Sequence, residues 1–539
     1  MFRANDGHRQ QGLFESTSLM DPRIVEKLKK SWAHIFYEHV FCNINEGLFA
    51  DLYSDMGRPN FPINVLLSLE YIKHMKCCND LELLDAFNFD FLVNYAVGIR
   101  TLGEVNLAER TIYNFRERVY KHCLENPGQD GILFGQFVEL LHVFADKIGL
   151  SMSEQRTDTT LFMSNIKKSG RLSLAYDVLV KAVKAIPEGM RAEALAKALE
   201  PDFKTDMLYR AKAQEADSRL AILLGLCGDA LKALEALPGA KQSSEARVLN
   251  RFLDEQSVMG PGGGGRLPKQ GKEIPSGSLQ SAHDEDATYR KKGNVGQSGY
   301  VLEISETCGK ENAVQLITDY AVKPNNVSDV SMLAGRLGAI RKNTGCADMY
   351  VDGGFHSEDV HEAAAKNNIE IHLTDMTGKK PAKLPVAEFD IDAGTDLILK
   401  CPGGHKPIRA GLSKGQTSAH FAHEACANCG LFDKCYSQKQ AKSNVVRINL
   451  KTVNASRERE IIKASRKENT SKRAGIEGTN SALKRKGQGK LGVRGIIRST
   501  FVSGCKVAAQ NISRFIKYMR GGYKPKPQKP PLDWVLAPI

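Results

Sequence analysis

The stretch Glu154-Gln-Arg-Thr-Asp158-Thr-Thr-Leu-Phe-Met163 is short and rich in β-branched threonine. Because β-branched residues suit the half-buried surface of a sheet, it predicts a strand that carries the acid Asp158. Two further strand-like runs, at 300–304 and 313–322, follow much later in the chain. Between them, residues 166–256 have a helical pattern in which Ala and Leu are abundant.

Helices and strands alternate after the third predicted strand. A predicted helix at 329–340 leads to a strand that ends at Asp352, in Tyr350-Val-Asp352-Gly-Gly-Phe355, and a helix at 357–366 precedes a strand at 369–374. This order of elements is that of a mixed sheet of the ribonuclease H type. We therefore predict a mixed α/β fold, with the large helical segment inserted between the first two strands. Asp158 and Asp352 then lie on strands that can be neighbours, and Asp352 stands at a strand end, where ligand sites are favoured.

The charge of the chain suits a polyanionic partner. Its 539 residues carry a formal net charge of +13, and Lys and Arg are concentrated between residues 439 and 529. Clustered positive charge favours contact with DNA or RNA, although a generally basic soluble protein would have the same composition. The twelve cysteines are scattered without a preceding secretory signal, which favours reduced thiols in a cytosolic protein. No apolar run is long enough for us to expect a membrane span.

A second decisive stretch is Arg473-Ala-Gly-Ile-Glu477-Gly-Thr-Asn-Ser-Ala-Leu-Lys484, which we interpret as a helix. At about 100° per residue, Glu477 lies about 40° from Arg473 and Lys484 about 20° from Glu477, so one acid and two cations share a face. Such a face is usually a surface ion-pair ladder. Gly475 and Gly478 flank Glu477 and each weakens an isolated helix by about 1 kcal/mol, which suggests a close approach of backbone or substrate.

Asp158, Asp352 and Glu477 would form a carboxylate site if they converged. Mg²⁺ prefers oxygen ligands, and two such ions can activate water and stabilise the leaving oxygen in phosphodiester cleavage. Arg473 and Lys484 beside the acids could then hold DNA phosphates. Each acid alone has an ordinary structural explanation, because an Asp before Gly-Gly is usually a turn residue and a Glu between cations is usually paired.

A cysteine cluster lies between the last predicted core strand and the Glu477 helix. Cys401 stands in Cys-Pro-Gly-Gly, Cys426 and Cys429 form a Cys-x-x-Cys pair followed by Gly, and Cys435 follows six residues later. Four thiolates at such spacing predict a closed, structural zinc site of the zinc-knuckle kind. An iron–sulfur cluster and free cysteines are the alternatives. Alternative zinc ligands are His405, His420 and His423.

The motifs together resemble a known family. Arg473, three residues, Glu477, six residues and Lys484 resemble the Arg-Glu-Lys part of the signature of bacterial insertion-sequence transposases of the DDE type. These transposases have a ribonuclease H-like catalytic core. In that signature a Tyr stands two intervening residues before the Arg, where this chain has Thr470.

The resemblance extends over most of the chain. Asp158 in Thr-Asp-Thr-Thr and Asp352 in Tyr-Val-Asp-Gly-Gly-Phe match the first and second Asp segments of the family. The apolar block 61–118 is similar to the helical N-terminal domain of these transposases. Taken alone, the short helices of this block, which end in a basic amphipathic one, suit either a helix-turn-helix DNA reader or a plain helical bundle.

The resemblance implies a mechanism. Asp158, Asp352 and Glu477 would bind two Mg²⁺ or Mn²⁺ ions, while Arg473 and Lys484 would contact DNA phosphates. The enzyme would cleave DNA at the terminal inverted repeats of its element, and the freed 3′-hydroxyl would attack target DNA. The implied partners are the DNA of the element ends, target DNA and, once DNA is bound, further copies of the chain. The implied location is the bacterial cytoplasm, at the nucleoid.

Three alternatives remain on the sequence alone. One is a DNA-binding protein without catalysis, another is a domesticated transposase that binds without strand transfer, and the third is a metal-dependent nuclease that cuts without joining. The predicted organisation comprises a helical N-terminal DNA-binding domain (1–150), a ribonuclease H-like core (151–165 and 299–376), a helical insertion with a Gly-rich linker (166–298), a zinc-knuckle insertion (377–445), the C-terminal part of the core with the Glu477 helix (446–520), and a flexible basic, Pro-rich tail (521–539).

Overall fold

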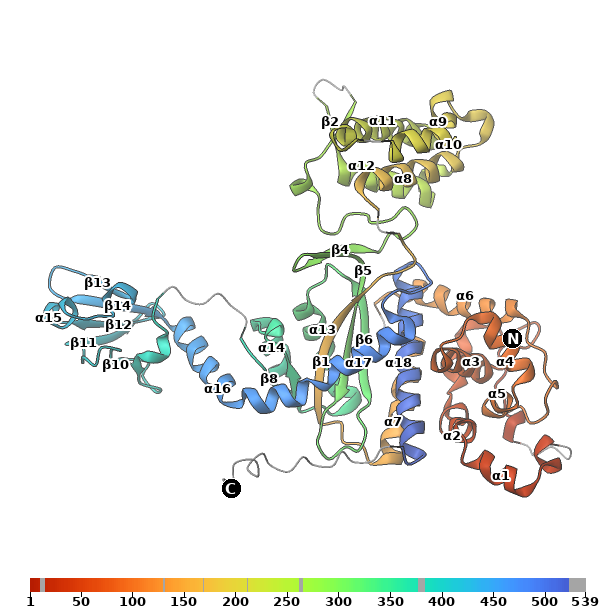
Figure 1. The fold of residues 1–539 in the computed structure, drawn as a ribbon, viewed down its shortest axis with the longest axis horizontal. Helices are drawn as coiled ribbons and strands as arrows, with labels where there is room; N and C mark the ends of the chain where they lie inside the picture. The colour runs from red at the N-terminus through yellow and green to blue at the C-terminus, as the bar shows by residue number, and fades with distance from the viewer. Residues whose placement is uncertain are drawn as a thin grey trace, which may run out of the picture.

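The computed structural model describes residues 1–9, 15–128, 131–167, 169–210, 212–260, 265–376 and 383–522. Figure 1 shows a central body from which two arms extend. The body holds the N-terminal helices and the main sheet, with α18 (Ile496–Met519) between them. One arm is a helical insertion, and the other is a small β module, residues 383–449, at the far end of the long helix α16 (Leu450–Arg473).

The main sheet has the mixed arrangement that the sequence predicts. Its strands in the described chain are β1 (Glu154–Phe162), β4 (Thr288–Lys292), β5 (Val295–Thr307), β6 (Ile317–Pro324), β7 (Asp348–Val351) and β8 (Glu370–Leu373). They are ordered β4-β5-β1-β7-β8, and β6 also pairs with β5. β1 runs antiparallel to β5 and parallel to β7. The predicted neighbourhood of the two Asp-bearing strands is therefore confirmed.

Helices cover both faces of this sheet. On one face, α13 (Asp329–Thr344) and α14 (Glu358–Lys366) share a hydrophobic cluster with Met349 of β7. On the other, α17 (Gly475–Leu483) and α18 share a larger cluster with Ile304 of β5. The helices predicted after the third strand and around Glu477 are thus present, with α17 directly following α16.

The N-terminal region is helical, as predicted. Its α-helices are α1 (Pro22–Lys29), α2 (Trp32–His39), α3 (Ile63–Lys76), α4 (Asp80–Phe89), α5 (Phe91–Ala96), α6 (Glu109–Glu125) and α7 (Ile132–Ile148). α3 begins directly after Pro62, whose fixed φ suits a helix start. α4 begins with a capping box, in which Asn79 accepts from the backbone of Glu82 and the Glu82 carboxylate accepts from the backbone of Asn79.

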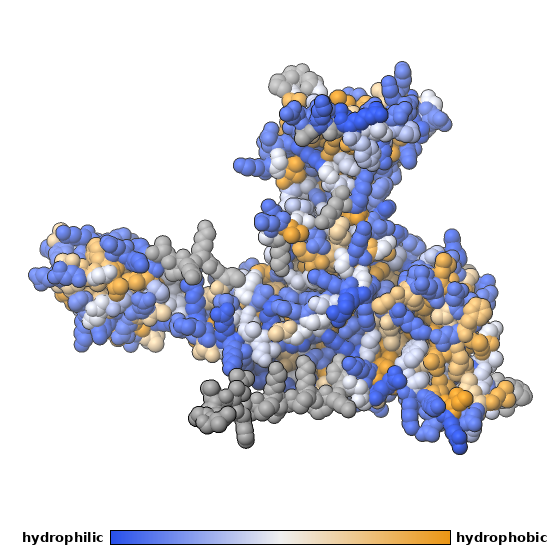
Figure 2. All heavy atoms as spheres, in the orientation of Figure 1, coloured by the Kyte–Doolittle hydropathy of each residue, from blue (hydrophilic) through white to orange (hydrophobic). Residues whose placement is uncertain are grey.

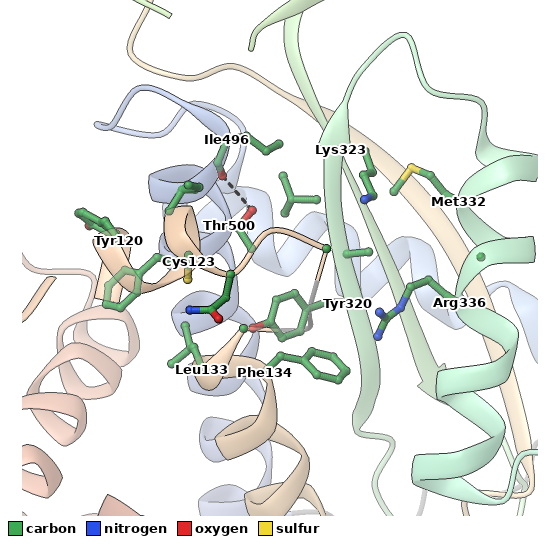
Figure 3. A pocket seen from close by; sticks show the side chains of 18 of the residues that line it. Tyr120, Cys123, Leu133, Phe134, Tyr320, Lys323, Met332, Arg336, Ile496 and Thr500 are labelled. Carbon is green, nitrogen blue, oxygen red and sulfur yellow. Dashed lines mark hydrogen bonds between the residues drawn. The ribbon is translucent and has the colours of Figure 1, made fainter. Parts of the chain in front are cut away.

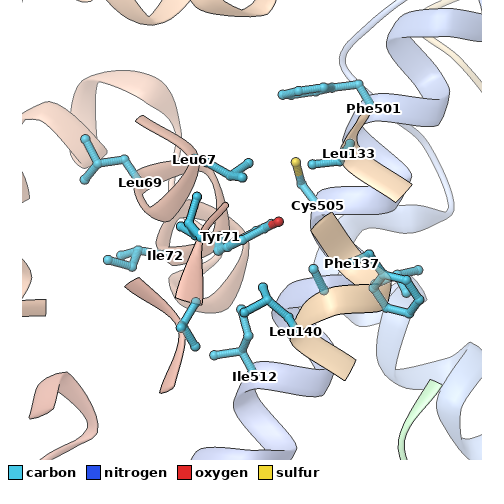
Figure 4. Close-up of a cluster of buried hydrophobic side chains, with 14 of the residues drawn as sticks. Leu67, Leu69, Tyr71, Ile72, Leu133, Phe137, Leu140, Phe501, Cys505 and Ile512 are labelled. Carbon is cyan, nitrogen blue, oxygen red and sulfur yellow. The ribbon is translucent and has the colours of Figure 1, made fainter. Parts of the chain in front are cut away.

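These helices do not form a core of their own. Figure 4 shows Tyr71 of α3, Leu140 of α7 and Ile512 of α18 facing one another in a single buried cluster. The cluster continues to Tyr320 of β6 and Ile304 of β5. The N-terminal helices and the main sheet are therefore joined through α18 by one hydrophobic core, which fixes their relative position.

The helical insertion has a separate core. It comprises α8 (Arg171–Ala185), α9 (Glu193–Lys197), α10 (Pro201–Lys204), α11 (Ala216–Glu235) and α12 (Ser244–Gln256), followed by the short hairpin of β2 (Ser257–Met259) and β3 (Arg266–Pro268). Leu179, Leu224 and Leu249 are fully buried within it. Because its cluster is distinct from that of the body, the insertion has the core of an independent folding unit.

The predicted Gly-rich linker needs correction after its first residues. Residues 261–264 lie outside the described chain, but β4 and the start of β5 form a hairpin that extends the main sheet. Gly293 and Asn294 make the turn, and Gly293 has a φ of +60°. A Gly-Asn pair between two runs is a hairpin signal. The polar run from Thr288 to Lys292 conceals the strand, because an edge strand needs no apolar alternation.

The β module contains strands that the sequence does not predict. Its strands in the described chain are β9 (Asp390–Ile391), β10 (Ile398–Lys400), β11 (Arg409–Ser413), β12 (Gln416–Phe421), β13 (Ser437–Lys439) and β14 (Asn444–Asn449), with the short helix α15 (His423–Ala427) after β12. The last four form the antiparallel sheet β11-β12-β14-β13. α16 starts directly after β14 and, at about 1.5 Å per residue, spans about 36 Å to the main sheet.

Figure 2 shows hydrophilic side chains over most of the viewed face, including α16, and hydrophobic side chains that gather over the N-terminal helices. Within the described residues, no helix combines the length and apolar character that crossing a membrane requires. From residue 523 onward, the predicted Pro- and Lys-rich tail lies outside the described chain.

The packing of α17 on β1 depends on a glycine. A Cβ added to Gly475 would collide with the guanidinium of Arg156, which projects from β1. A Cβ added to Gly478, one turn further along the same helix, would meet no atom within 4 Å. The close approach of Arg156 to the helix backbone therefore explains Gly475, whereas no described residue approaches Gly478 in this way.

We predict opposite effects of Gly475→Ala and Gly478→Ala on stability. Alanine at 478 should leave the free energy of unfolding unchanged or raise it by up to about 1 kcal/mol, because Ala favours helix over Gly. Alanine at 475 should lower that free energy by about 1–3 kcal/mol, because the side chain must displace a buried guanidinium. Urea denaturation measures both, and equal effects of the two substitutions would contradict the packing.

Candidate active site

Asp158 and Asp352 lie on the same face of the main sheet. Arg156 of β1 pairs in register with Tyr350 of β7, and each acid stands two residues after its member of this pair. Side chains two residues apart in a strand point to the same face. The parallel pairing of β1 and β7 therefore brings the two carboxylates together, although almost two hundred residues separate them.

Glu477 reaches the same place from α17, and Arg473 lies at the centre. One terminal nitrogen of Arg473 is 3.4 Å from Oδ1 of Asp158 and 3.3 Å from Oδ2 of Asp352. The other terminal nitrogen is 3.3 Å from Oε1 of Glu477. Three acids from distant parts of the chain thus surround one guanidinium.

The site is open to solvent on one side. The side chain of Asp158 is 17% exposed, that of Asp352 41% and that of Glu477 67%. Asp158 therefore forms the floor, and Glu477 stands at the rim. A phosphodiester backbone could approach from the Glu477 side without unfolding any element.

Neighbouring groups orient the two aspartates. The side-chain amide of Asn480 donates to Oδ2 of Asp158 at 3.0 Å, and the backbone N–H of Gly354 donates to Oδ1 of Asp352 at 2.8 Å. In both acids the second oxygen faces Arg473. In each aspartate, a neutral donor therefore contacts one oxygen while the other oxygen faces a cation.

Lys472 has a structural role beside the site. Its ammonium donates to Glu154 at 2.7 Å and to the hydroxyl of Tyr350 at 2.8 Å. Burial lowers the pKa of Lys472, but the hydrogen bonds and charge interactions with Glu154 and Tyr350 together outweigh burial, and the net pKa is raised. The group stays charged and fastens the end of α16 to β1 and β7.

A buried ion-pair network lies beneath the acids. Glu306 of β5 is fully buried and accepts from Arg156 at 2.8 Å, from Arg514 of α18 at 3.0 Å and from the hydroxyl of Thr479 at 2.7 Å. Arg156 also donates to the backbone carbonyl of Lys472 at 2.6 Å. A buried carboxylate requires such partners, and here they come from β1, α17 and α18.

The predicted phosphate contacts occupy different environments. Arg473 is directed at the carboxylates, with a side chain only 15% exposed. Lys484, which follows α17, is exposed, and its ammonium has no hydrogen bond or ion pair within the described residues. Thr470, at the position of the signature Tyr, is exposed on α16. Lys484 is therefore free to meet a phosphate, whereas Arg473 must first leave the acids.

The donor set fits hard divalent cations, but the site must rearrange to hold them. Mg²⁺ and Mn²⁺ take carboxylate oxygens and water, which is what Asp158, Asp352 and Glu477 offer. Among the described residues, no choice of one oxygen from each acid puts all three within 4.8 Å of one another. The guanidinium of Arg473 lies between them and supplies the countercharge that a metal ion would replace.

The four cysteines of the β module line one small cavity. Cys401, Cys426, Cys429 and Cys435 all contribute to it, beside apolar side chains such as Phe421. A Cβ added to Gly403 would lie 3.2 Å from Sγ of Cys429 and 3.7 Å from Sγ of Cys401. Burial raises the pKa of Cys435, and backbone N–H groups of Ser437 and Tyr436 oppose this rise. These N–H groups would stabilise a thiolate there.

The thiols are gathered but not closed into a tetrahedron. Sulfur ligands of one zinc ion lie about 3.8 Å apart, and among the described residues no three of these sulfur atoms lie within 4.8 Å of one another. Of the alternative ligands, His405 lines the same cavity, whereas His420 and His423 do not. His420 instead contacts Ser443 at 2.9 Å.

Residues 400–516 match the family model described as Transposase DDE domain. The matched part holds Glu477, Arg473 and the four cysteines, whereas Asp158 and Asp352 lie outside it. A DDE domain implies a ribonuclease H-like core, polynucleotidyl transfer, divalent metals and DNA binding. The comparisons with curated proteins and with solved structures give no match.

Among the described residues, an apolar cavity lies away from Asp158, Asp352 and Glu477. It has a volume of about 540 Å³ and lies between α7, β6, α13 and α18. Figure 3 shows Tyr320 and Phe134 side by side in its wall, with their ring centres 5.3 Å apart. Since none of the three acids lines it, this cavity is not part of the candidate site.

The sequence interpretation missed the residues that support the three acids. Asn480 stands three residues after Glu477, and Arg156 stands two residues before Asp158, so each shares a face with an acid. That spacing was the available signal. Glu306 could not have been found, because nothing in the run around it distinguishes a buried acid from an exposed one.

Arg473→Ala should destabilise the protein in chelator and strengthen its response to metal. Without the guanidinium, three carboxylates repel one another, which should lower the free energy of unfolding by about 1–2 kcal/mol for this partly exposed site. Added Mn²⁺ should then raise the melting temperature of the variant more than that of wild type, because no cation must be displaced. Arg466→Ala, on the same helix with an exposed pair to Asp375, is the control. Identical melting curves for wild type and Arg473→Ala, with and without Mn²⁺, would contradict this account.

Proposed function

We propose that the protein is a DDE transposase that cleaves DNA at the terminal inverted repeats of an insertion sequence and joins the ends to target DNA. The observation that carries the proposal is the convergence of Asp158, Asp352 and Glu477 around Arg473. The match of the C-terminal region to a transposase DDE domain supports it independently, because that match does not include either aspartate.

In this proposal the three acids hold two Mg²⁺ or Mn²⁺ ions. Bound there, the ions would supply an activated water and compensate the charge that develops on the phosphate. Asp158 would present one oxygen while Asn480 holds the other, and Asp352 would do the same against the N–H of Gly354. Glu477, exposed at the rim, has the freedom to adjust its position to the incoming strand.

The chemistry consists of two phosphoryl transfers. Water attacks the phosphorus at the end of the element, and the 3′-oxygen leaves as a hydroxyl. That 3′-hydroxyl then attacks a phosphorus of target DNA and displaces a second 3′-oxygen, so one phosphodiester bond forms as one breaks. Neither transfer needs a covalent protein intermediate, which agrees with a site built from carboxylates rather than a Ser or Tyr nucleophile.

Arg473 has two successive positions in this scheme. In the described state it neutralises the acids, and the loaded site would release it towards the DNA. Lys484, Arg485 and Lys490 are exposed on and after the end of α17 and would meet the backbone beside it. Cations that neutralise phosphates make binding salt-dependent, so these residues should set affinity rather than sequence preference.

We also propose that the thiols of the β module hold one structural zinc ion. Cys401, Cys426, Cys429 and Cys435 would be its ligands, with His405 as the nearest substitute. The module has a small core around Phe421 and Val446, and small cores usually need a metal or disulfide. All four thiols are free of disulfide bonds.

The catalytic proposal predicts that Asp158→Asn, Asp352→Asn and Glu477→Gln each lower end cleavage and joining by at least about 100-fold. The assay uses purified protein, Mg²⁺ or Mn²⁺, and DNA that carries the element ends. Asp375→Asn, an exposed acid paired with Arg466, is the matched control and should keep activity. Cleavage that persists in Glu477→Gln would remove Glu477 from the mechanism. Cleavage without joined products would identify a nuclease, and binding without any metal-dependent product would identify a DNA-binding protein.

The zinc proposal predicts that Cys426→Ser combined with Cys429→Ser removes one zinc ion per chain. Cys42→Ser, at an exposed cysteine of the N-terminal region, should keep the wild-type content. Metal analysis of the purified proteins gives the result. Equal zinc in all three proteins would exclude a thiol site. Loss of zinc should also lower the melting temperature, because binding energy at such a site is folding energy.

A further inference from the structure

A second group of potential metal ligands lies behind the carboxylate site. His356 follows Asp352 by four residues, His361 is in the first turn of α14, and Glu458 is on α16. Nε2 of His356 lies 3.2 Å from one oxygen of Glu458, and Nε2 of His361 lies 3.6 Å from the other. One ligand atom from each side chain can be chosen so that all three lie within 4.8 Å of one another.

The geometry is close to that of a bound ion. Zinc bonds of 2.0–2.1 Å to nitrogen and oxygen put neighbouring ligands of a tetrahedral ion about 3.3 Å apart. The two separations from Glu458 bracket that value, and the imidazole rings lie edge to face with centres 5.5 Å apart. Small side-chain rotations would therefore suffice to close the three ligands on one ion.

The arrangement leaves a polar atom unexplained. Nε2 of His361 is buried and makes no hydrogen bond within the described chain. Buried polar atoms nearly always have a partner, so this nitrogen calls for a hydrogen bond or an ion. All three side chains remain between about one quarter and two fifths exposed, which leaves space for water to complete a coordination shell.

Two other groups of described residues bring three potential ligands together, and both are less suited. In the first, Glu70, His74 and Cys505 are buried, but Arg116 already pairs with Glu70 at 2.6 Å and its charge would oppose an ion. In the second, His372 hydrogen-bonds Asp348 at 2.8 Å, and Glu370 is 75% exposed. Nε2 of His74 is also buried without a hydrogen bond, but the charges of Lys506, Lys73 and Arg116 around it would oppose an ion.

We propose that His356, His361 and Glu458 form a site for a borderline divalent transition metal, of which Zn²⁺ is the leading example. Imidazole nitrogen suits Zn²⁺, Co²⁺ and Ni²⁺, whereas Mg²⁺ prefers oxygen ligands throughout. The site therefore differs in metal preference from the three carboxylates and in ligand type from the four thiols. It does not depend on whether the protein is a transposase.

The location gives the ion a structural role. Glu458 is on the helix that ends at Arg473, and His356 is on the segment that begins at Asp352. An ion between them would fasten α16 to α14 and to the segment behind Asp352. The ion would thereby fix α16, which carries Arg473, against the end of β7, which Asp352 follows.

Co²⁺ binding to the chelator-treated full-length protein tests the site, with Mg²⁺ in excess to saturate the carboxylates. A Co²⁺ ion bound by the cysteines of the β module would show thiolate-to-cobalt absorption. Wild type should bind one further Co²⁺ per chain without that absorption. Glu458→Gln and His361→Ala should each lower the affinity for this second Co²⁺ by at least about tenfold and leave the thiolate absorption unchanged. Glu460→Gln, two residues along α16 with its exposed carboxylate near Lys463, should bind as wild type does.

Two outcomes would overturn the proposal. One is a wild type that binds no Co²⁺ beyond the thiolate-ligated ion. The other is a Glu458→Gln variant with wild-type stoichiometry and affinity. Circular dichroism confirms that each variant is folded, and His361→Ala gives an independent result if Glu458→Gln unfolds. Asp352→Asn should retain the ion, which separates this site from the catalytic proposal.

Discussion

The burial of Glu306 is the constraint on which the rest of the site depends. This carboxylate is fully buried in the main sheet, where an unpaired charge would be strongly unfavourable. Its partners are Arg156 from β1, Thr479 from α17 and Arg514 from α18. Satisfying one buried acid therefore draws two helices onto one face of the sheet. Glu477 and Asn480 lie on the first of these helices, so the position of the outer acids follows from the inner one.

Part of this architecture follows from sequence patterns alone. The strand around Asp158 is marked by its threonines, and the strand before Asp352 by its apolar residues and the Gly-Gly turn. Both are local signals, and the parallel pairing of the two strands follows from the order of elements between them. The helix around Glu477 is likewise local. These three elements already bring the acids into one region, which is why their convergence could be predicted.

What could not be predicted depends on contacts between distant segments. A spacing of four residues places Arg473 and Glu477 on one face, but it does not show that the guanidinium turns inward to Asp158 and Asp352. The strands of the β module are short and are defined by their pairing with one another, as β12 pairs with β14, rather than by a long apolar run. The edge strand β4 has no apolar alternation because Tyr289, Arg290 and Lys291 are exposed or half-buried, so neither of its faces is packed in the core. In each case the deciding partner lies elsewhere in the sequence.

The attachment of α16 to the main sheet determines how the guanidinium of Arg473 can leave the three acids. The side chain of Asn469 donates to the backbone carbonyl of Leu373, and Lys472 is hydrogen-bonded to Glu154 and Tyr350. The last turn of α16, which ends at Arg473, is thus attached to the main sheet through Asn469 and Lys472. These contacts hold the backbone of Arg473 in place. The guanidinium can leave the acids only by rotation about its own side-chain bonds. Arg473 is only 15% exposed and must break three ion pairs before it rotates, but this movement is smaller than the displacement of a helix. In the proposed function, replacement of Arg473 by a metal ion would therefore be a local side-chain rearrangement that leaves α16 in place.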